Sequence, residues 1–142
     1  MIEIIIAGTA TYFLAKYFFR KEMNMKQREI DVDKKKIEND FQYYLRSAHV
    51  TSLMLVASKK EITELELKKL ETWSHRVIES HKIFKPTDME IRDILENCDK
   101  FIRKWTDGKM NLSDPLLLAD LKMITVNLSR VGHKYNFDLS IA

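Results

Sequence analysis

Glycine, proline and cysteine are scarce in this 142-residue sequence, which contains three, two and one of them, respectively. Because glycine and proline interrupt helices and form turns, their scarcity argues against a loop-rich or disordered chain. The glycines stand alone at positions 8, 108 and 132, so no glycine-rich phosphate-binding loop is present. The single cysteine, Cys98, excludes an intramolecular disulfide framework and is compatible with a reducing compartment.

A strong net charge is also missing, since 24 basic and 21 acidic residues leave only +3. Residues 1–21 account for +2 of this charge and the remaining 121 residues for +1. A nucleic-acid-binding protein usually presents a basic face across its folded body. The neutral body therefore argues against a nucleic-acid partner.

The N-terminal segment is the most distinctive part of the chain. Residues 4–15 carry no charge, and the apolar run reaches Phe19 with Lys16 as its only interruption. A helix that spans a membrane needs about 20 apolar residues, and about 17 is the low end. The length is borderline, and two interpretations stay open. Residues 1–21 form either a membrane anchor or a helix buried in the core of the protein or in a partner.

The residues that flank this run favour the anchor. Three aromatic residues, at positions 17–19, precede a basic cluster, as is typical of a membrane interface. The candidate contacts to lipid head groups are Lys16, Arg20, Lys21, Lys26 and Arg28. By the positive-inside tendency, the C-terminal body would lie in the cytoplasm. The alternative localisation is cytoplasmic without a membrane anchor.

Small residues recur every four positions within the apolar run, at Ala7, Thr11 and Ala15. They share one helical face, and small residues at this spacing allow two membrane helices to approach closely. This stripe is a candidate packing surface for a homo-oligomer. Small residues are also common in such helices without any contact of this kind.

After residue 21 the sequence predicts an all-α fold, a bundle of about four amphipathic helices preceded by the apolar N-terminal helix. The expected domains are the N-terminal helix (1–21), the bundle (22–132) and an extended C-terminal tail (133–142). Apolar residues recur at spacings of three, four and seven. The first stripe is Ile30, Ile37, Phe41, Tyr44, Leu45, Ala48, Ser52 and Leu55, and the second is Ile62, Leu65, Leu70, Trp73, Val77 and Phe84. The third is Ile91, Ile94, Leu95, Cys98, Ile102 and Trp105, and the fourth is Leu117, Leu121, Ile124, Leu128 and Val131.

Capping signals mark the ends of these helices. Three pairs have the capping-box spacing: Ser58 with Glu61, Thr63 with Glu66, and Thr87 with Glu90. Ser113-Asp114-Pro115 predicts another helix start, with proline in the first turn. Gly108 is the candidate left-handed residue after the third helix.

No arrangement of titratable residues predicts catalysis, a metal site or a cofactor. Glu71, His75 and Glu79 share one helical face, but the sequence contains no His-Glu-x-x-His motif and no paired Glu-x-x-His motifs. Cys98 lies on an apolar stripe and reads as a core residue. His49 lies beside a core face, which indicates a packed or interfacial histidine and not a catalytic base.

The leading hypothesis from the sequence is a membrane-tethered, non-catalytic helical protein that binds or scaffolds a protein partner at the cytoplasmic face. The alternative is a soluble all-α regulator or inhibitor whose N-terminal helix is buried in its core or in a partner. Lysine outnumbers arginine 17 to 7, a bias typical of AT-rich genomes such as those of many phages and some bacteria. This bias indicates origin, not mechanism; in the alternative hypothesis the regulator would be phage-encoded and act on a host enzyme or defence system.

Overall fold

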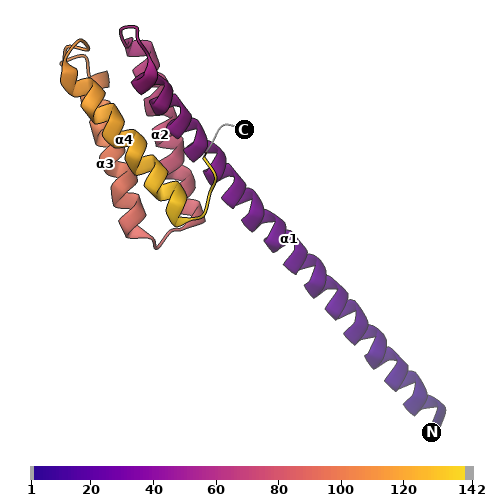
Figure 1. The fold of residues 1–142 in the computed structure, drawn as a ribbon. Helices are drawn as coiled ribbons and strands as arrows, with labels where there is room; N and C mark the ends of the chain where they lie inside the picture. The colour runs from indigo at the N-terminus through magenta and orange to yellow at the C-terminus, as the bar shows by residue number, and fades with distance from the viewer. Residues whose placement is uncertain (1, 140–142) are drawn as a thin grey trace. The chain divides into compact units, whose positions relative to one another are not determined.

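The computed structural model describes the backbone of residues 2–139 and, within it, the side chains of Lys16 and of residues 20–139. These residues form four helices and no strand, which confirms the all-α class. The helices are α1 (Ile2–Ala57), α2 (Glu64–Phe84), α3 (Met89–Thr106) and α4 (Pro115–Lys134), as Figure 1 shows.

Helix α1 continues without a break through the predicted N-terminal segment and the first bundle helix. No proline lies in this stretch, and its one glycine stands near the beginning, so nothing in the sequence forces the helix to end. The chain divides into two compact units, residues 1–36 and residues 37–142. In the first unit every described side chain is exposed, including Ile30 at 48%. The prediction that Ile30 belongs to the core face was wrong.

Within the part of the chain described above, no helix is long and apolar enough to cross a membrane. Charged side chains recur along α1 from Lys16 and Arg20 onward, which interrupts any long apolar run there. The membrane anchor predicted at residues 1–21 therefore has no support from this structure. The predicted packing residues Ala7, Thr11 and Ala15 fall among the side chains that are not described.

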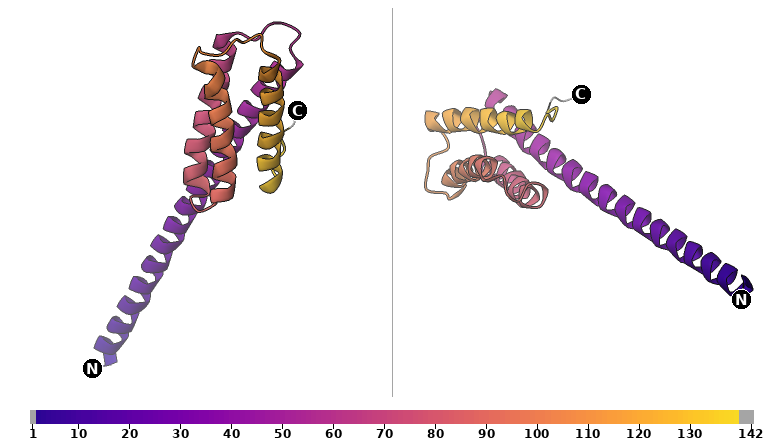
Figure 2. Two further views of the ribbon diagram at one scale, coloured as in Figure 1. Left: turned by 90° about the vertical axis from the view of Figure 1, so that its left-hand side faces the viewer. Right: turned by 90° about the horizontal axis from the view of Figure 1, so that it is seen from below.

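The second unit is an antiparallel helical bundle built from the C-terminal part of α1 and from α2, α3 and α4. The α1–α2 and α3–α4 connections lie at one end, and the α2–α3 turn lies at the other, beside the end of α4 (Figures 1 and 2). Short connections of this kind bring consecutive helices side by side. We call the end with the α2–α3 turn the tail end, because the C-terminal residues leave α4 there.

One apolar core fills the bundle, and all four helices contribute to it. The stripes predicted for α3 and α4 are confirmed, since their residues are buried except for the half-buried Ile94. In α1 the buried face begins at Phe41 and continues through Leu45, Ala48, Ser52 and Leu55. Burying each large apolar side chain contributes about 1.5–3 kcal/mol, so this core supplies most of the stability.

The stripe predicted for α2 is confirmed in part, since Leu70 and Val77 are buried, but it misses some of the residues on the buried face. Leu65 was assigned to the core but is 65% exposed, whereas Leu67 is fully buried. Ser74 and His81 also lie inside, on the face that Leu67 and Leu70 define. The spacing of apolar residues in α2 did not reveal the whole buried face, because two polar residues occupy core positions and weaken the apolar periodicity there.

Side-chain caps fix where the helices begin, and they differ in part from the predicted capping boxes. Thr63 caps α2 by accepting a hydrogen bond from the Glu66 amide at 3.3 Å, so Ser58 is not the cap. Asp88, not Thr87, caps α3, since its Oδ1 accepts from the Ile91 amide at 3.3 Å. The predicted start of α4 at Asp114 is confirmed.

The end of α3 also follows the prediction. Helix α3 ends at Thr106, and Gly108 has a φ of +78°, in the left-handed region. Glycine adopts this conformation without the steric penalty that a β-carbon imposes. The residue lets the chain reverse direction toward α4.

Three polar contacts connect pairs of helices within the core. The hydroxyls of Ser52 (α1) and Thr125 (α4) lie 2.9 Å apart. Ser74 (α2) donates to Asp99 (α3) at 3.2 Å, and the indole Trp105 Nε1 (α3) donates to Asp120 (α4) at 2.8 Å. Buried polar groups need such partners because unpaired ones cost free energy, so these contacts help to select one arrangement of the helices.

The residues after α4 fold back against the bundle. Asn136, in the left-handed region with a φ of +57°, turns the chain, and the Phe137 amide donates to the Gly132 carbonyl at 2.8 Å. Leu139 is then buried directly over Gly132, where an added β-carbon would lie only 2.6 Å from Leu139 Cδ1. Arg46 of α1 donates to the Asp138 carbonyl at 2.8 Å. We call residues 135–139 the tail.

Candidate functional site

A groove of about 280 Å³ runs between α1 and α2 on the surface of the second unit. Its residues come from both helices, because the two pack together through large side chains that leave a furrow on the outside. The lining residues are Ile37, Asp40 and Tyr44 from α1, and Arg76, Glu79, Ser80 and Ile83 from α2. The furrow is mostly apolar, with charged groups along it.

Three aromatic rings and one arginine contact one another in and beside this groove. Tyr43 and Tyr44 of α1 contact Trp73 of α2, with ring centroids 6.0 Å and 6.3 Å from the indole. The Arg76 guanidinium carbon lies 5.8 Å from the Tyr44 ring centroid and 6.0 Å from that of Trp73. These cation–π contacts hold Arg76 over the rings and order a side chain that is otherwise flexible. Tyr44 and Arg76 line the groove, and their contacts with Tyr43 and Trp73 place an aromatic surface beside it.

The groove lining also includes an exposed apolar side chain and two carboxylates. Ile83 is 65% exposed, so its side chain offers apolar area along the groove. Asp40 and Glu79 are exposed as well, and Glu79 accepts from Lys82 at 3.3 Å. A ligand that fits this surface would bring apolar area to Ile83 and positive charge to the carboxylates.

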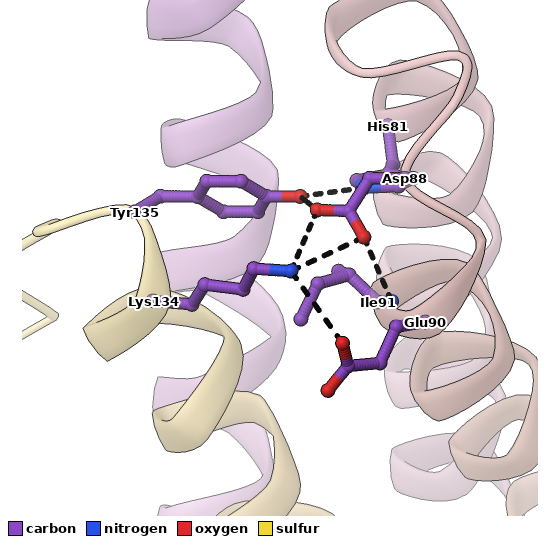
Figure 3. Close-up of polar contacts among 6 residues, drawn as sticks. All are labelled: His81, Asp88, Glu90, Ile91, Lys134 and Tyr135. Carbon is purple, nitrogen blue, oxygen red and sulfur yellow. Dashed lines mark hydrogen bonds and ion pairs between the residues drawn. The ribbon is translucent and has the colours of Figure 1, made fainter.

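A second polar cluster lies at the tail end and centres on Asp88 (Figure 3). Tyr135 donates its hydroxyl hydrogen to Asp88 Oδ2 at 2.6 Å, and Lys134 Nζ lies 3.0 Å and 3.2 Å from the two carboxylate oxygens. The Tyr135 bond, followed by those from Lys134 and Ile91, lowers the pKa of Asp88 to about 2. Burial, with the adjacent carboxylate, raises the pKa of Tyr135. Both groups therefore keep their neutral-pH protonation states over a wide pH range.

His81 joins this cluster from the interior. Its ring is fully buried, and Nε2 lies 3.0 Å from the Tyr135 hydroxyl oxygen. Asp88 is ionised and can only accept, so it takes the single hydroxyl hydrogen of Tyr135. His81 Nε2 must therefore be the donor to Tyr135, which fixes the neutral tautomer and leaves Nδ1 without a hydrogen. Nδ1 is buried and has no hydrogen-bond partner.

The remaining titratable residues that the sequence singled out do not meet. Glu71 is half-buried while His75 and Glu79 are exposed, and no group of three potential ligands among the described residues could hold a metal ion. Cys98 is buried, which raises the pKa of its thiol to about 12 and makes it a poor nucleophile. Burial lowers the pKa of His49.

The predicted lipid contacts Lys16, Arg20, Lys21, Lys26 and Arg28 all lie on α1 in the first unit, and all are exposed. Their contact with lipid head groups stays a prediction.

Comparisons with known proteins add no further assignment. No protein-family model matches the chain, and searches of curated proteins and of solved structures found no similar protein.

The groove was not predicted from the sequence, which singled out only Ile37, Tyr44 and Glu79 of its lining residues. Tyr44 and Trp73 were assigned to core stripes, and both are only half-buried. Their contact joins positions 29 residues apart, which one-dimensional periodicity does not report. The one local signal was the three-residue spacing of Trp73 and Arg76, which places a ring and a guanidinium on one helical face.

Proposed function

We propose that this chain is a non-catalytic helical protein that binds a protein partner in the groove between α1 and α2. The supporting observation is the cluster of two tyrosines, a tryptophan and an arginine in and beside the groove, of which Tyr44 and Arg76 line it. Tryptophan, tyrosine and arginine are the residues most enriched where interfaces derive their binding energy. The ring contacts already made in the free protein also help, because restricted side chains lose less entropy on binding.

The partner element that best fits the groove is an amphipathic helix. A furrow between two helices accepts the apolar face of a third, with anchors spaced at three and four residues. Exposed Ile83 would contact that apolar face. Asp40 and Glu79 would face basic residues beside it, since complementary charge favours association and suppresses wrong partners.

Site-specific photo-crosslinking tests this proposal in the full-length chain. A photo-crosslinking amino acid replaces Ile83 in one variant and Val126 of α4 in the control, two large aliphatic residues of similar exposure, 65% and 57%. The expected result is that position 83 captures a partner that position 126 does not capture. The crosslinked peptide from the partner should be an amphipathic helical segment with basic residues.

Binding of the purified partner then tests the contact itself. Ile83→Lys removes the apolar contact and adds a charge of the wrong sign, and we expect affinity to fall at least about tenfold. Val126→Lys makes the same chemical change on α4 and should leave affinity unchanged. Equal effects of the two substitutions, or a partner that crosslinks equally from both positions, would refute the groove as the binding site.

The membrane-tethered form of this function stays a prediction. Its support is the uncharged run of residues 4–15 followed by five exposed basic residues, beginning at Lys16. Fractionation of cells that express the full chain or a version without residues 1–21 distinguishes it from the soluble regulator. Membrane association of the full chain alone would favour the tether, whereas a soluble full chain would favour the regulator.

A further inference from the structure

The tail covers an aromatic cluster at the tail end of the bundle. Phe41 of α1 stacks on Phe84 of α2 with ring centroids 5.3 Å apart. Tyr135 and Phe137 of the tail lie against Phe41, each with a centroid distance of 5.8 Å, and against Phe84 at 5.5 Å and 6.1 Å. The tail thus excludes water from rings that would otherwise be exposed at this end.

The tail is held there by polar contacts as well as by its rings. The Tyr135 hydroxyl is bonded to both Asp88 and His81, as Figure 3 shows. Both contacts use one hydroxyl group, and the ring of His81 also lies against Phe41, with centroids 5.4 Å apart. The attachment of Tyr135 therefore depends on His81 remaining in its buried position.

From this geometry we infer that His81 is an acid-sensitive latch that holds the tail at neutral pH and releases it when its ring is protonated. In the neutral ring, Nε2 donates to Tyr135 and Nδ1 carries no hydrogen. The only nitrogen that can accept a proton is Nδ1, which is buried with no acceptor within reach. Protonation would place both an unpaired N–H and a positive charge in the interior, which is strongly unfavourable.

The charged groups around His81 act in the same direction on balance. Burial is the main cause that lowers the pKa of His81 below 6.5, and the positive charge of Arg92 on α3 is the next. Asp88 in the α2–α3 turn raises the pKa, and Lys134 of α4 lowers it. From α1 the facing group is the uncharged ring of Phe41. Since the latched state binds the proton more weakly than the released state, acid favours release.

The sign and the pH window follow from this difference. Above about pH 6.5 both states are neutral, and the latch is at full strength. Each pH unit below that value shifts the equilibrium toward release by up to about tenfold, until the pKa of the latched state is reached. The ionised state of Asp88 does not change in this window, because its pKa is about 2.

Nuclear magnetic resonance of the full-length chain between pH 7.5 and 4.5 tests the inference. The ¹⁵N shifts of the His81 ring report its tautomer and titration, and amide order parameters report the tail. We expect the Nε2–H tautomer at pH 7.5, and tail order parameters that fall from about 0.85 to below about 0.6 on acidification. The amides of α3 should keep their shifts throughout, because the bundle stays folded.

Substitution supplies the matched controls. His81→Gln retains a side-chain N–H donor but has no titrating group, so its tail should stay ordered at pH 4.5. His75→Gln makes the same change at an exposed position of α2, and its tail should be released as in the unsubstituted protein.

Several results would overturn the latch. The first is a tail that stays ordered at pH 4.5 although His81 is protonated. The second is a pH midpoint of tail release that differs from the pH midpoint of His81 titration. The third is release of the tail that occurs only together with loss of the α3 signals. The comparison of ring and tail midpoints in the unsubstituted protein decides the question even where His81→Gln loses the tail at every pH.

Discussion

Gly132 allows the close approach of the tail to α4. Its replacement by alanine should change the free energy of unfolding in opposite directions with and without the Leu139 side chain. An added β-carbon would lie 2.6 Å from Leu139 Cδ1 and 2.8 Å from Leu139 Cγ, both well inside van der Waals contact. Gly132 is in the helical conformation, so backbone strain plays no part. The substitution therefore opposes two effects: a steric clash with Leu139 and the better helix propensity of alanine.

The magnitudes decide which effect prevails. Leu139 is 8% exposed, and loss of its burial costs about 2 kcal/mol. Alanine inside a helix is more favourable than glycine by about 1 kcal/mol. We expect Gly132→Ala to lower the free energy of unfolding by about 1 kcal/mol in the unsubstituted background. In a Leu139→Ala background the clash is gone, and the same substitution should raise the free energy of unfolding by up to about 1 kcal/mol.

Urea unfolding followed by circular dichroism at 222 nm measures all four members of this double-mutant cycle. The coupling free energy between positions 132 and 139 should be about 2 kcal/mol, because the clash exists only when both the added carbon and the Leu139 side chain are present. The reasoning is refuted if Gly132→Ala has the same sign in both backgrounds. Such a result would mean that the tail does not pack over Gly132 in solution.

Three further predictions concern single residues. The pKa of Asp88 is lowered to about 2, so its contribution to the free energy of unfolding is present above about pH 4 and is lost as the pH falls toward 2. Asp88→Ala, which also removes the cap of α3, should lower the free energy of unfolding by about 1–2 kcal/mol at pH 7. It should also flatten the dependence of the urea midpoint on pH below pH 4. The Cys98 thiol, with its pKa raised to about 12, should resist Ellman's reagent at pH 8 in the folded protein and react fully in urea; rapid reaction without denaturant would contradict its burial. Gly108→Ala should lower the free energy of unfolding by about 1 kcal/mol because of the positive φ, although no atom lies within 4 Å of the added carbon. Gly108→Asn should lower it by less, because asparagine tolerates the left-handed region. Equal shifts of the melting temperature for the two variants would argue against this backbone conformation.

Local signals in the sequence were sufficient for much of the bundle. The stripes of α3 and α4 were read correctly because almost all their core positions hold apolar residues at helical spacing. The cap at Asp114 and the reversal at Gly108 were also read correctly, since each depends on conformational preferences of neighbouring residues. These features need no information from distant parts of the chain.

Helix α2 shows where local reading failed. His81 occupies a fully buried position because Tyr135, 54 residues later, supplies its hydrogen-bond partner. The residues around His81 do not indicate this distant partner, so the sequence did not predict His81 in the core. The sequence instead placed Leu65 there, because it is apolar. The cap of α3 was misplaced by one residue for a related reason, since Asp88 is selected by Tyr135 and Lys134 as well as by the helix it begins.

The candidate binding surface was decided in the same way by tertiary contacts. The sequence alone determined that the chain forms amphipathic helices, that its body is nearly neutral and that its first residues are apolar, because these follow from composition and periodicity. Only the folded chain brings Tyr43 and Tyr44 against Trp73, places Arg76 over the rings and seats the tail over Gly132. Such features require residues from different helices to meet, and their positions are set by how the helices pack together.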